Sequence, residues 1–140
     1  MHLEEILLNR GLIDAQQLAA ARQQAAGRRL DHGMMRELTS DECKIHLEQA
    51  TDKPLLLDVR EPWEYRIVHL EGSTLIPMRQ IPQQADALDP GRETIVICHH
   101  GIRSRQVARF LESRGFSNVI NLAGGVDAWA KEVDPGMRTY

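Results

Sequence analysis

The stretch that decides the fold covers residues 94–104 and reads Thr94-Ile95-Val96-Ile97-Cys98-His99-His100-Gly101-Ile102-Arg103-Ser104. It opens with four β-branched residues, which are typical of a buried strand in a parallel sheet. Beyond it, Val107, Phe110 and Leu111 recur at helical spacing, and Gly115 supplies a stop. The pattern predicts a strand, a short loop and a helix, with the cysteine at the carboxyl end of the strand.

The alternation of apolar runs and helical patterns continues over residues 34–140. Further strands are expected at 36–38, 55–59, 73–76 and 118–121. The strand before Pro77 is expected near a sheet edge, because proline cannot donate a backbone hydrogen bond. Helices are expected from Ser40, as the N-cap, to about Ala50, over 103–114, and after Gly124-Gly125. This rhythm predicts an α/β fold, a small parallel sheet with helices on both faces.

Residues 1–33 differ in composition from the rest of the chain. Residues 15–26 consist of Ala, Gln, Leu and Arg, a strongly helical mixture, and Asp14 is a suitable N-cap. We expect a short helical hairpin, followed by a polar linker bounded by glycines at residues 27–33. Within the hairpin, the stretches Leu3-Glu4-Glu5-Ile6-Leu7, Arg10-Gly11-Leu12-Ile13-Asp14 and Gln17-Leu18 resemble the leading helical segment of secretion and pilus assembly ATPases. We interpret it as a helical extension that could dock a protein partner.

Size and composition indicate a single globular domain. The chain has 140 residues, of which 42% are hydrophobic and 26% charged, and its formal net charge is −3. This charge gives no general attraction to nucleic acid or anionic lipid, so neither is expected as a partner. No run approaches the roughly 20 apolar residues of a membrane helix, and the acidic start differs from a signal peptide. We therefore expect a cytoplasmic protein.

Cys98 is the residue of the central stretch with the clearest chemical potential. Ligands of open parallel sheets bind beyond the carboxyl ends of the strands, where a loop entering a helix directs unpaired backbone N–H groups. These amides, the helix dipole and Arg103 favour a thiolate over a thiol, so Cys98 is a plausible nucleophile. His99 and His100 add positive charge when protonated. The alternative is that Cys98 is a small core residue.

Three motifs, in this order along the chain, resemble single-domain rhodaneses over residues 34–140. The first is Asp58-Val59-Arg60-Glu61, Trp63-Glu64-Tyr65, His69-Leu70-Glu71-Gly72-Ser73 and Ile76-Pro77. The second is the loop from Cys98 to Ser104. The third is Gly115-Phe116-Ser117-Asn118-Val119 with Leu122-Ala123-Gly124-Gly125-Val126-Asp127-Ala128-Trp129. Val68 and Ser73 depart from the family pattern, which more often has glycine and alanine there.

The resemblance implies a sulfurtransferase of the thiosulfate sulfurtransferase type. Cys98 would take the sulfane sulfur of a small anionic donor as a persulfide and pass it to a thiol or protein acceptor. Arg103 would orient the donor, and Asp58, Arg60 and Glu64 would be supporting polar groups. No cofactor and no metal is expected. The backbone amides of the substrate-binding loop would surround the persulfide; its residues are His99, His100, Gly101, Ile102, Arg103 and Ser104.

Other functions remain in competition with sulfur transfer. The fold could serve as a non-catalytic binding module. A cysteine-dependent phosphatase or arsenate reductase is less favoured, because the loop from Cys98 to Arg103 is one residue shorter than phosphatase loops of this type. A metal site made by Cys98, His99 and His100 is also less favoured, because adjacent side chains rarely converge.

Two residues with reactive side chains have simpler interpretations. His69 is interpreted as a structural residue that forms a hydrogen bond, although a histidine beside the Glu-Tyr helix could look catalytic. Cys43, on the first helix of the domain, is interpreted as a packing residue. The minority interpretation makes Cys43 a resolving thiol for Cys98.

Overall fold

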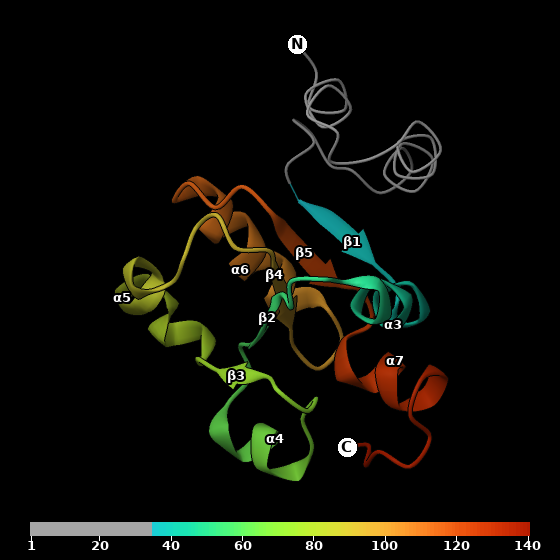
Figure 1. Cartoon of the computed structure of the whole chain (residues 1–140). Helices are drawn as coiled ribbons and strands as arrows, with labels where there is room; N and C mark the ends of the chain where they lie inside the picture. The colour runs from blue at the N-terminus through green and yellow to red at the C-terminus, as the bar shows by residue number, and fades with distance from the viewer. Residues whose placement is uncertain (1–34) are drawn as a thin grey trace, which may run out of the picture.

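The computed structural model describes residues 35–140 of the chain. The expected N-terminal hairpin, its linker and the likeness to assembly ATPases lie outside these residues. A five-stranded sheet organises the described part, with strand order β1-β5-β4-β2-β3, and every neighbouring pair is parallel. The strands are β1 (Arg36–Leu38), β2 (Leu55–Asp58), β3 (Thr74–Leu75), β4 (Thr94–Ile97) and β5 (Val119–Leu122). The α/β prediction is confirmed, including the edge position of the strand before Pro77 (Figure 1).

Helices cover both faces of the sheet, as expected. The helical elements are α3 (Ser40–Gln49), α4 (Pro62–Ile67), η2 (Met78–Gln80), α5 (Ile81–Gln84), η3 (Ala85–Ala87), α6 (Ile102–Ser113) and α7 (Gly125–Glu132), where η marks a 3₁₀ helix. Residues of α3 and α7 pack with one apolar cluster, and residues of α5 and α6 pack with another. In Figure 1, α3 and α7 lie on one side of the strands and α5 and α6 on the other.

The start of α3 corrects one prediction. Thr39, not Ser40, is the N-cap: its Oγ1 accepts a hydrogen bond from the Glu42 N–H at 3.3 Å, and the Glu42 carboxylate accepts one from the Thr39 N–H at 2.9 Å. This reciprocal capping box satisfies two backbone donors at once. With Ser40 as the N-cap, the residue three positions on would be Cys43, which has no carboxylate or amide oxygen to accept the second hydrogen bond. The Ser40 hydroxyl instead donates to Glu132 at 2.9 Å, linking α3 to α7.

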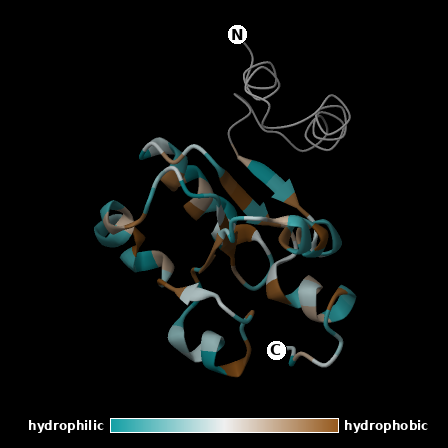
Figure 2. Ribbon diagram, viewed as in Figure 1, coloured by the Kyte–Doolittle hydropathy of each residue, from teal (hydrophilic) through white to brown (hydrophobic). Residues whose placement is uncertain are grey.

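Alternation along the central strand sets the direction of Cys98. Ile95 and Ile97 belong to the cluster under α3 and α7, whereas Val96 and Cys98 belong to the cluster under α6. Successive side chains of a strand point to opposite faces, so the cysteine continues the α6 side of β4. Figure 2 shows this strand region as hydrophobic, with hydrophilic residues concentrated on the outer helices.

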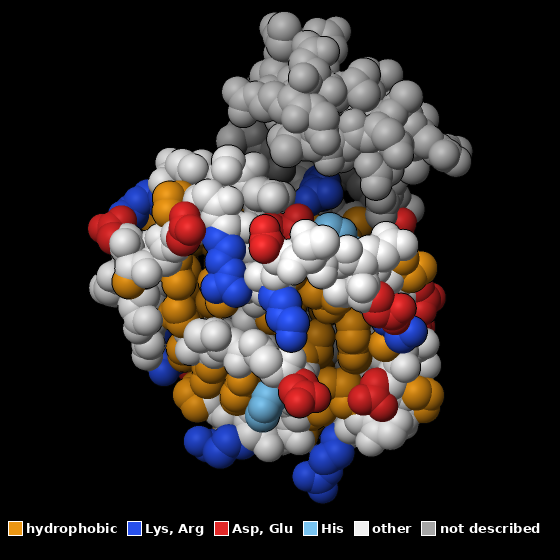
Figure 3. Space-filling model, in the orientation of Figure 1, with side chains coloured by type: hydrophobic (Ala, Val, Ile, Leu, Met, Phe, Trp, Pro, Cys, Tyr) orange, Lys and Arg blue, Asp and Glu red, His pale blue; other side chains and the backbone are white. Residues whose placement is uncertain are grey.

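The described surface carries charges of both signs. Figure 3 shows Lys and Arg side chains interspersed with Asp and Glu over one face, without a field of a single sign. Among the described residues, none of the helices has the length and hydropathy that a membrane crossing requires.

Candidate active site

Cys98 lies directly after β4, at the carboxyl edge of the sheet. Cys98 is buried, with 1% of its surface exposed to solvent. The neighbouring strand β2 ends beside it, because Asp58 is in register with Ile97. The topology therefore brings the end of β2, with its polar residues, next to the cysteine loop.

The loop turns back over the cysteine at Gly101. This glycine is the N-cap of α6 with φ of 96°, and its N–H donates to Cys98 Sγ at 3.0 Å. A Cβ at this position would lie 2.9 Å from the Gly124 backbone nitrogen. Both the left-handed conformation and the close approach to the β5–α7 turn therefore require glycine.

The start of α7 fixes the other side of the loop. The Val126 N–H donates to Cys98 O at 2.9 Å, and the Asp127 N–H donates to His99 O at 3.1 Å. A Cβ on Gly125 would lie 2.3 Å from Cys98 O, so the double glycine lets the helix approach this closely. Two carbonyl groups of the loop are thus held by α7.

A buried polar network surrounds the sulfur on the α6 side. Ser104 Oγ lies 3.3 Å from Cys98 Sγ and 2.5 Å from Asn121 Oδ1, and Asn121 Nδ2 donates to Gly101 O at 3.1 Å. Ser104 and Asn121 are both fully buried. Asn121 is a site residue that the sequence analysis missed, because a single Asn within an apolar strand carries no motif of its own.

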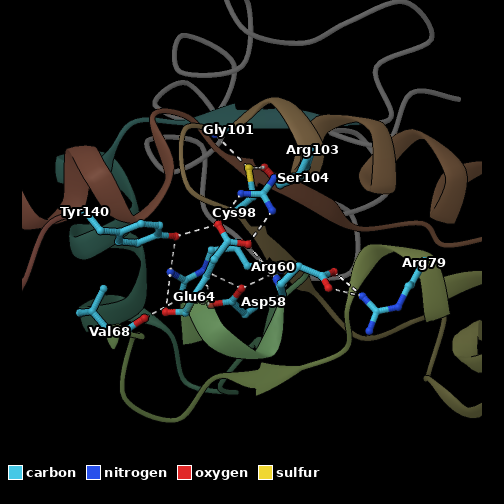
Figure 4. Close-up of polar contacts among 11 residues, drawn as sticks. Asp58, Arg60, Glu64, Val68, Arg79, Cys98, Gly101, Arg103, Ser104 and Tyr140 are labelled. Carbon is cyan, nitrogen blue, oxygen red and sulfur yellow. Dashed lines mark hydrogen bonds and ion pairs between the residues drawn. The ribbon is translucent and has the colours of Figure 1, made fainter. Parts of the chain in front are cut away.

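Arg103 is paired with a carboxylate at the beginning of α6. Its guanidinium forms hydrogen bonds of 2.7 and 2.8 Å to the two oxygens of Glu64 (Figure 4). These bonds hold the pKa of Glu64 at about 2, against the opposing effect of burial, and raise the pKa of Arg103. The expectation that Arg103 orients an anionic donor stays a prediction, with the added finding that its charge is shared with Glu64.

The expected supporting residues Asp58 and Arg60 form an ion pair. Both side chains are fully buried, with Arg60 Nη2 2.7 Å from Asp58 Oδ2. Arg60 also donates to Val68 O at 2.6 Å and to the Tyr140 hydroxyl at 2.8 Å. A buried carboxylate at a strand end is stable here because it is paired and hydrogen-bonded.

Tyr140 is a second residue that sequence reasoning missed. Its hydroxyl donates to Glu64 Oε1 at 3.0 Å, and its ring stacks on His99 with centroids 3.9 Å apart and planes at 7°. Figure 4 shows Tyr140, Arg60 and Glu64 linked to Arg103 by a continuous series of polar contacts. No local pattern around a C-terminal tyrosine could predict contacts with residues so distant in sequence.

The two histidines of the loop differ in environment. Burial lowers the pKa of His99, and the neighbouring His100 acts in the same direction, so the neutral form of His99 is favoured. His100 is exposed and lies 3.9 Å from the Asp127 carboxylate. The conditional expectation that His99 adds positive charge when protonated is therefore met only at lower pH.

One group of described residues has metal-type donors close together. The candidate ligand atoms of His99, His100 and Asp127 lie within 4.8 Å of one another. The two imidazole rings lie against each other, tilted by 34° with centroids 3.9 Å apart. The Asp127 carboxylate already pairs with Lys131 Nζ at 2.9 Å. We assign no metal to this group.

His69 and Cys43 lie apart from the sulfur network. His69 Nδ1 donates to Tyr65 O at 2.8 Å, and its ring stacks on Tyr65. Cys43 is fully buried within the α3 and α7 cluster, and burial, together with Glu93, raises the pKa of its thiol to about 12. Both observations agree with the structural interpretations of these residues.

Comparison with known proteins identifies relatives over the described domain. The family model for the rhodanese-like domain matches residues 39–132. The chloroplastic rhodanese-like/PpiC domain-containing protein 12 of Arabidopsis thaliana is 43% identical over 93 residues, which are 64% of this chain and 31% of that protein. A sulfurtransferase of Allochromatium vinosum is 32% identical over 98 residues, which are 70% of this chain and 91% of that protein.

Solved structures share the fold. The crystal structure of a rhodanese-like domain protein from Staphylococcus aureus superposes with a TM-score of 0.64 and 29% identity, covering 74% of this chain and 97% of that one. The chain spans less than a third of the Arabidopsis relative, so the agreement concerns the domain that both contain.

Proposed function

Because the chain belongs to the rhodanese-like domain family, we propose that it is a sulfurtransferase in which Cys98 carries the transferred sulfur as a persulfide. The observation that supports this most directly is the buried sulfur at the carboxyl edge of the sheet, with the Gly101 N–H donating to it at 3.0 Å. The name of the similar Allochromatium protein agrees with such an activity.

The proposed loading step is a displacement at sulfur. The Cys98 thiol loses its proton, and the thiolate attacks the outer sulfur of thiosulfate. A new S–S bond forms, the bond between the two thiosulfate sulfurs breaks, and sulfite leaves with that electron pair. The released proton ends on sulfite, so one thiol and one thiosulfate give one persulfide anion and one hydrogensulfite. The charge then rests on the outer sulfur.

Discharge completes the cycle. The thiol of a small molecule or of an acceptor protein attacks the outer sulfur, the acceptor leaves as a persulfide anion, and its proton returns to Cys98. The loop supports both steps by its backbone: the Gly101 N–H faces the sulfur, and α7 holds the Cys98 and His99 carbonyls away from it.

Single-turnover sulfite release tests this function. The full chain is mixed with excess thiosulfate without an acceptor, and the sulfite formed per chain is measured. We expect one equivalent from wild type and from Cys43→Ser, and none from Cys98→Ser. Parallel assays with a phosphate ester measure the competing phosphatase activity. Release of phosphate without sulfite would contradict the proposal and support a phosphatase. Inactivity with every sulfane donor would contradict it and favour a binding module.

A further inference from the structure

Asn121 fixes the direction of the hydrogen bonds of Ser104, the side chain that contacts the Cys98 sulfur. Gly101 O can only accept, so the Asn121 amide nitrogen faces it and the amide oxygen faces Ser104. The Ser104 hydroxyl has a single proton, which it donates to Asn121 Oδ1 at 2.5 Å. Towards the sulfur, Ser104 therefore presents a lone pair, which can accept from a thiol S–H at 3.3 Å.

This direction distinguishes the charge states of the sulfur. A Cys98 thiol completes the ring of hydrogen bonds, because its proton points to Ser104 Oγ. A bare thiolate would face that lone pair instead and would keep the Gly101 N–H as its donor. The inner sulfur of a persulfide carries no charge, since the charge rests on the outer atom. The network therefore suits the thiol best, because only the thiol has a proton for Ser104, and it tolerates the uncharged inner sulfur of a persulfide better than a bare thiolate.

We propose that Asn121 is a positioning residue: by holding the Ser104 proton away from Sγ, it disfavours the bare Cys98 thiolate and favours the loaded over the unloaded anion. The part about loading rests on the proposed function. The part about the proton concerns the free cysteine alone. Because Ser104 and Asn121 are fully buried, no water replaces the missing donor without a rearrangement of the loop.

The nearby charged groups are paired with one another, so the hydrogen bonds of Ser104 and Asn121 decide which charge state of the sulfur is favoured. Arg103 and Arg105 both interact electrostatically with Cys98, and each is paired with a carboxylate, Glu64 or Glu37. The neutral form of His99 is favoured, and the nearby Asp127 pairs with Lys131. These two arginines thus share their charge with an acid.

Alkylation of Cys98 by iodoacetamide at neutral pH, followed on the Cys98 peptide, tests the proton assignment. In Asn121→Ala, the Ser104 hydroxyl is free to turn to the thiolate, so the rate constant should rise about tenfold, as expected for one hydrogen bond to a charged group. Ser104→Ala should not slow alkylation, and the double variant should lose the gain seen in Asn121→Ala. Ser113→Ala, on the same helix, should match wild type.

Two results would overturn the assignment. A gain in Asn121→Ala that persists in the double variant would mean that loosening of the loop, not the Ser104 proton, exposes the sulfur. A rate in Ser104→Ala about tenfold below wild type would mean that Ser104 already donates to the thiolate, and this variant decides the point even if Asn121→Ala does not fold.

The loaded state is tested separately. At a fixed ratio of thiosulfate to sulfite, and at a pH high enough for the unloaded Cys98 to be a thiolate, Asn121→Ala should carry less persulfide than wild type. An unchanged loaded fraction would contradict the role in loading. If wild type itself takes no sulfur from any donor, the proposed function fails, whereas the alkylation series still decides the proton assignment.

Discussion

Arg103 and Glu64 form a two-point ion pair that joins the beginning of α6 to α4. The two hydrogen bonds measure 2.7 and 2.8 Å, and the Glu64 side chain is 5% exposed while that of Arg103 is 36% exposed. The pair fixes the first turn of the helix whose N-cap, Gly101, donates to the sulfur. An interaction outside the loop therefore helps to hold the loop in place.

Removing the charge of Glu64 should weaken the domain. Glu64→Gln keeps the size of the side chain but loses one of the two charged hydrogen bonds, so we expect a loss of about 2 kcal/mol in the free energy of unfolding in urea. Glu71→Gln, at an exposed turn, is the matched control and should stay within about 0.5 kcal/mol of wild type. Equal stability of both variants would show that the pair contributes nothing.

The same carboxylate should give stability a dependence on acid pH. The Arg103 hydrogen bonds lower the pKa of Glu64 from 4.5 to about 2 in the folded protein. An acid with a depressed pKa stabilises the fold above its unfolded pKa, and this contribution is lost as the pH falls towards the folded value. The stability difference between wild type and Glu64→Gln should therefore shrink between about pH 5 and pH 2. A difference that stays constant over this range would contradict the assignment.

Gly101 should tolerate no side chain. Gly101→Ala places a Cβ 2.9 Å from the Gly124 nitrogen at a positive φ, so we expect a loss of at least 2 kcal/mol of stability and at least tenfold slower sulfite release. Gly115→Ala has nearly the same φ but open space around its Cβ, so it should cost about 1 kcal/mol and leave release unchanged. Similar release rates for both variants would contradict the role of Gly101.

The hydroxyl and the ring of Tyr140 should each contribute to the stability of the domain. Tyr140→Phe keeps the stack on His99 but removes the hydroxyl between Arg60 and Glu64, so we expect a loss of about 1 kcal/mol in urea unfolding. Tyr140→Ala removes both contacts and should cost at least 1 kcal/mol more. If Tyr140→Ala unfolds at the same urea concentration as wild type, the observed contacts carry no stability.

The strands of the sheet could be predicted because each one is marked by a local pattern in the sequence. Thr94–Ile97 and the run at 55–59 are apolar and bounded by polar turns, and their positions in the structure agree to within a residue. The double glycine at 124–125 likewise marked the beginning of α7. Thr39 was missed as the N-cap although Thr39-Ser40-Asp41-Glu42 has the capping-box pattern, which Ser40 lacks because Cys43 follows it at the third position.

The candidate site was only half predictable. Cys98 and its loop could be identified because strand, loop and helix follow one another in the chain. The partners of that loop could not, since Glu64 reaches Arg103 across 39 positions and Asn121 reaches Ser104 across 17. Such contacts arise when the parallel strands bring their carboxyl ends together, and residue type alone does not say which polar groups will meet.

The account depends most directly on whether Cys98 holds a sulfur atom. Intact-mass spectrometry of the full chain after thiosulfate treatment, with fragment spectra to locate the added mass, measures this. We expect one added sulfur on Cys98 in wild type and in Cys43→Ser, removed by reductant, and none in Cys98→Ser. Added sulfur on Cys43, or an equal gain in Cys98→Ser, would contradict the account.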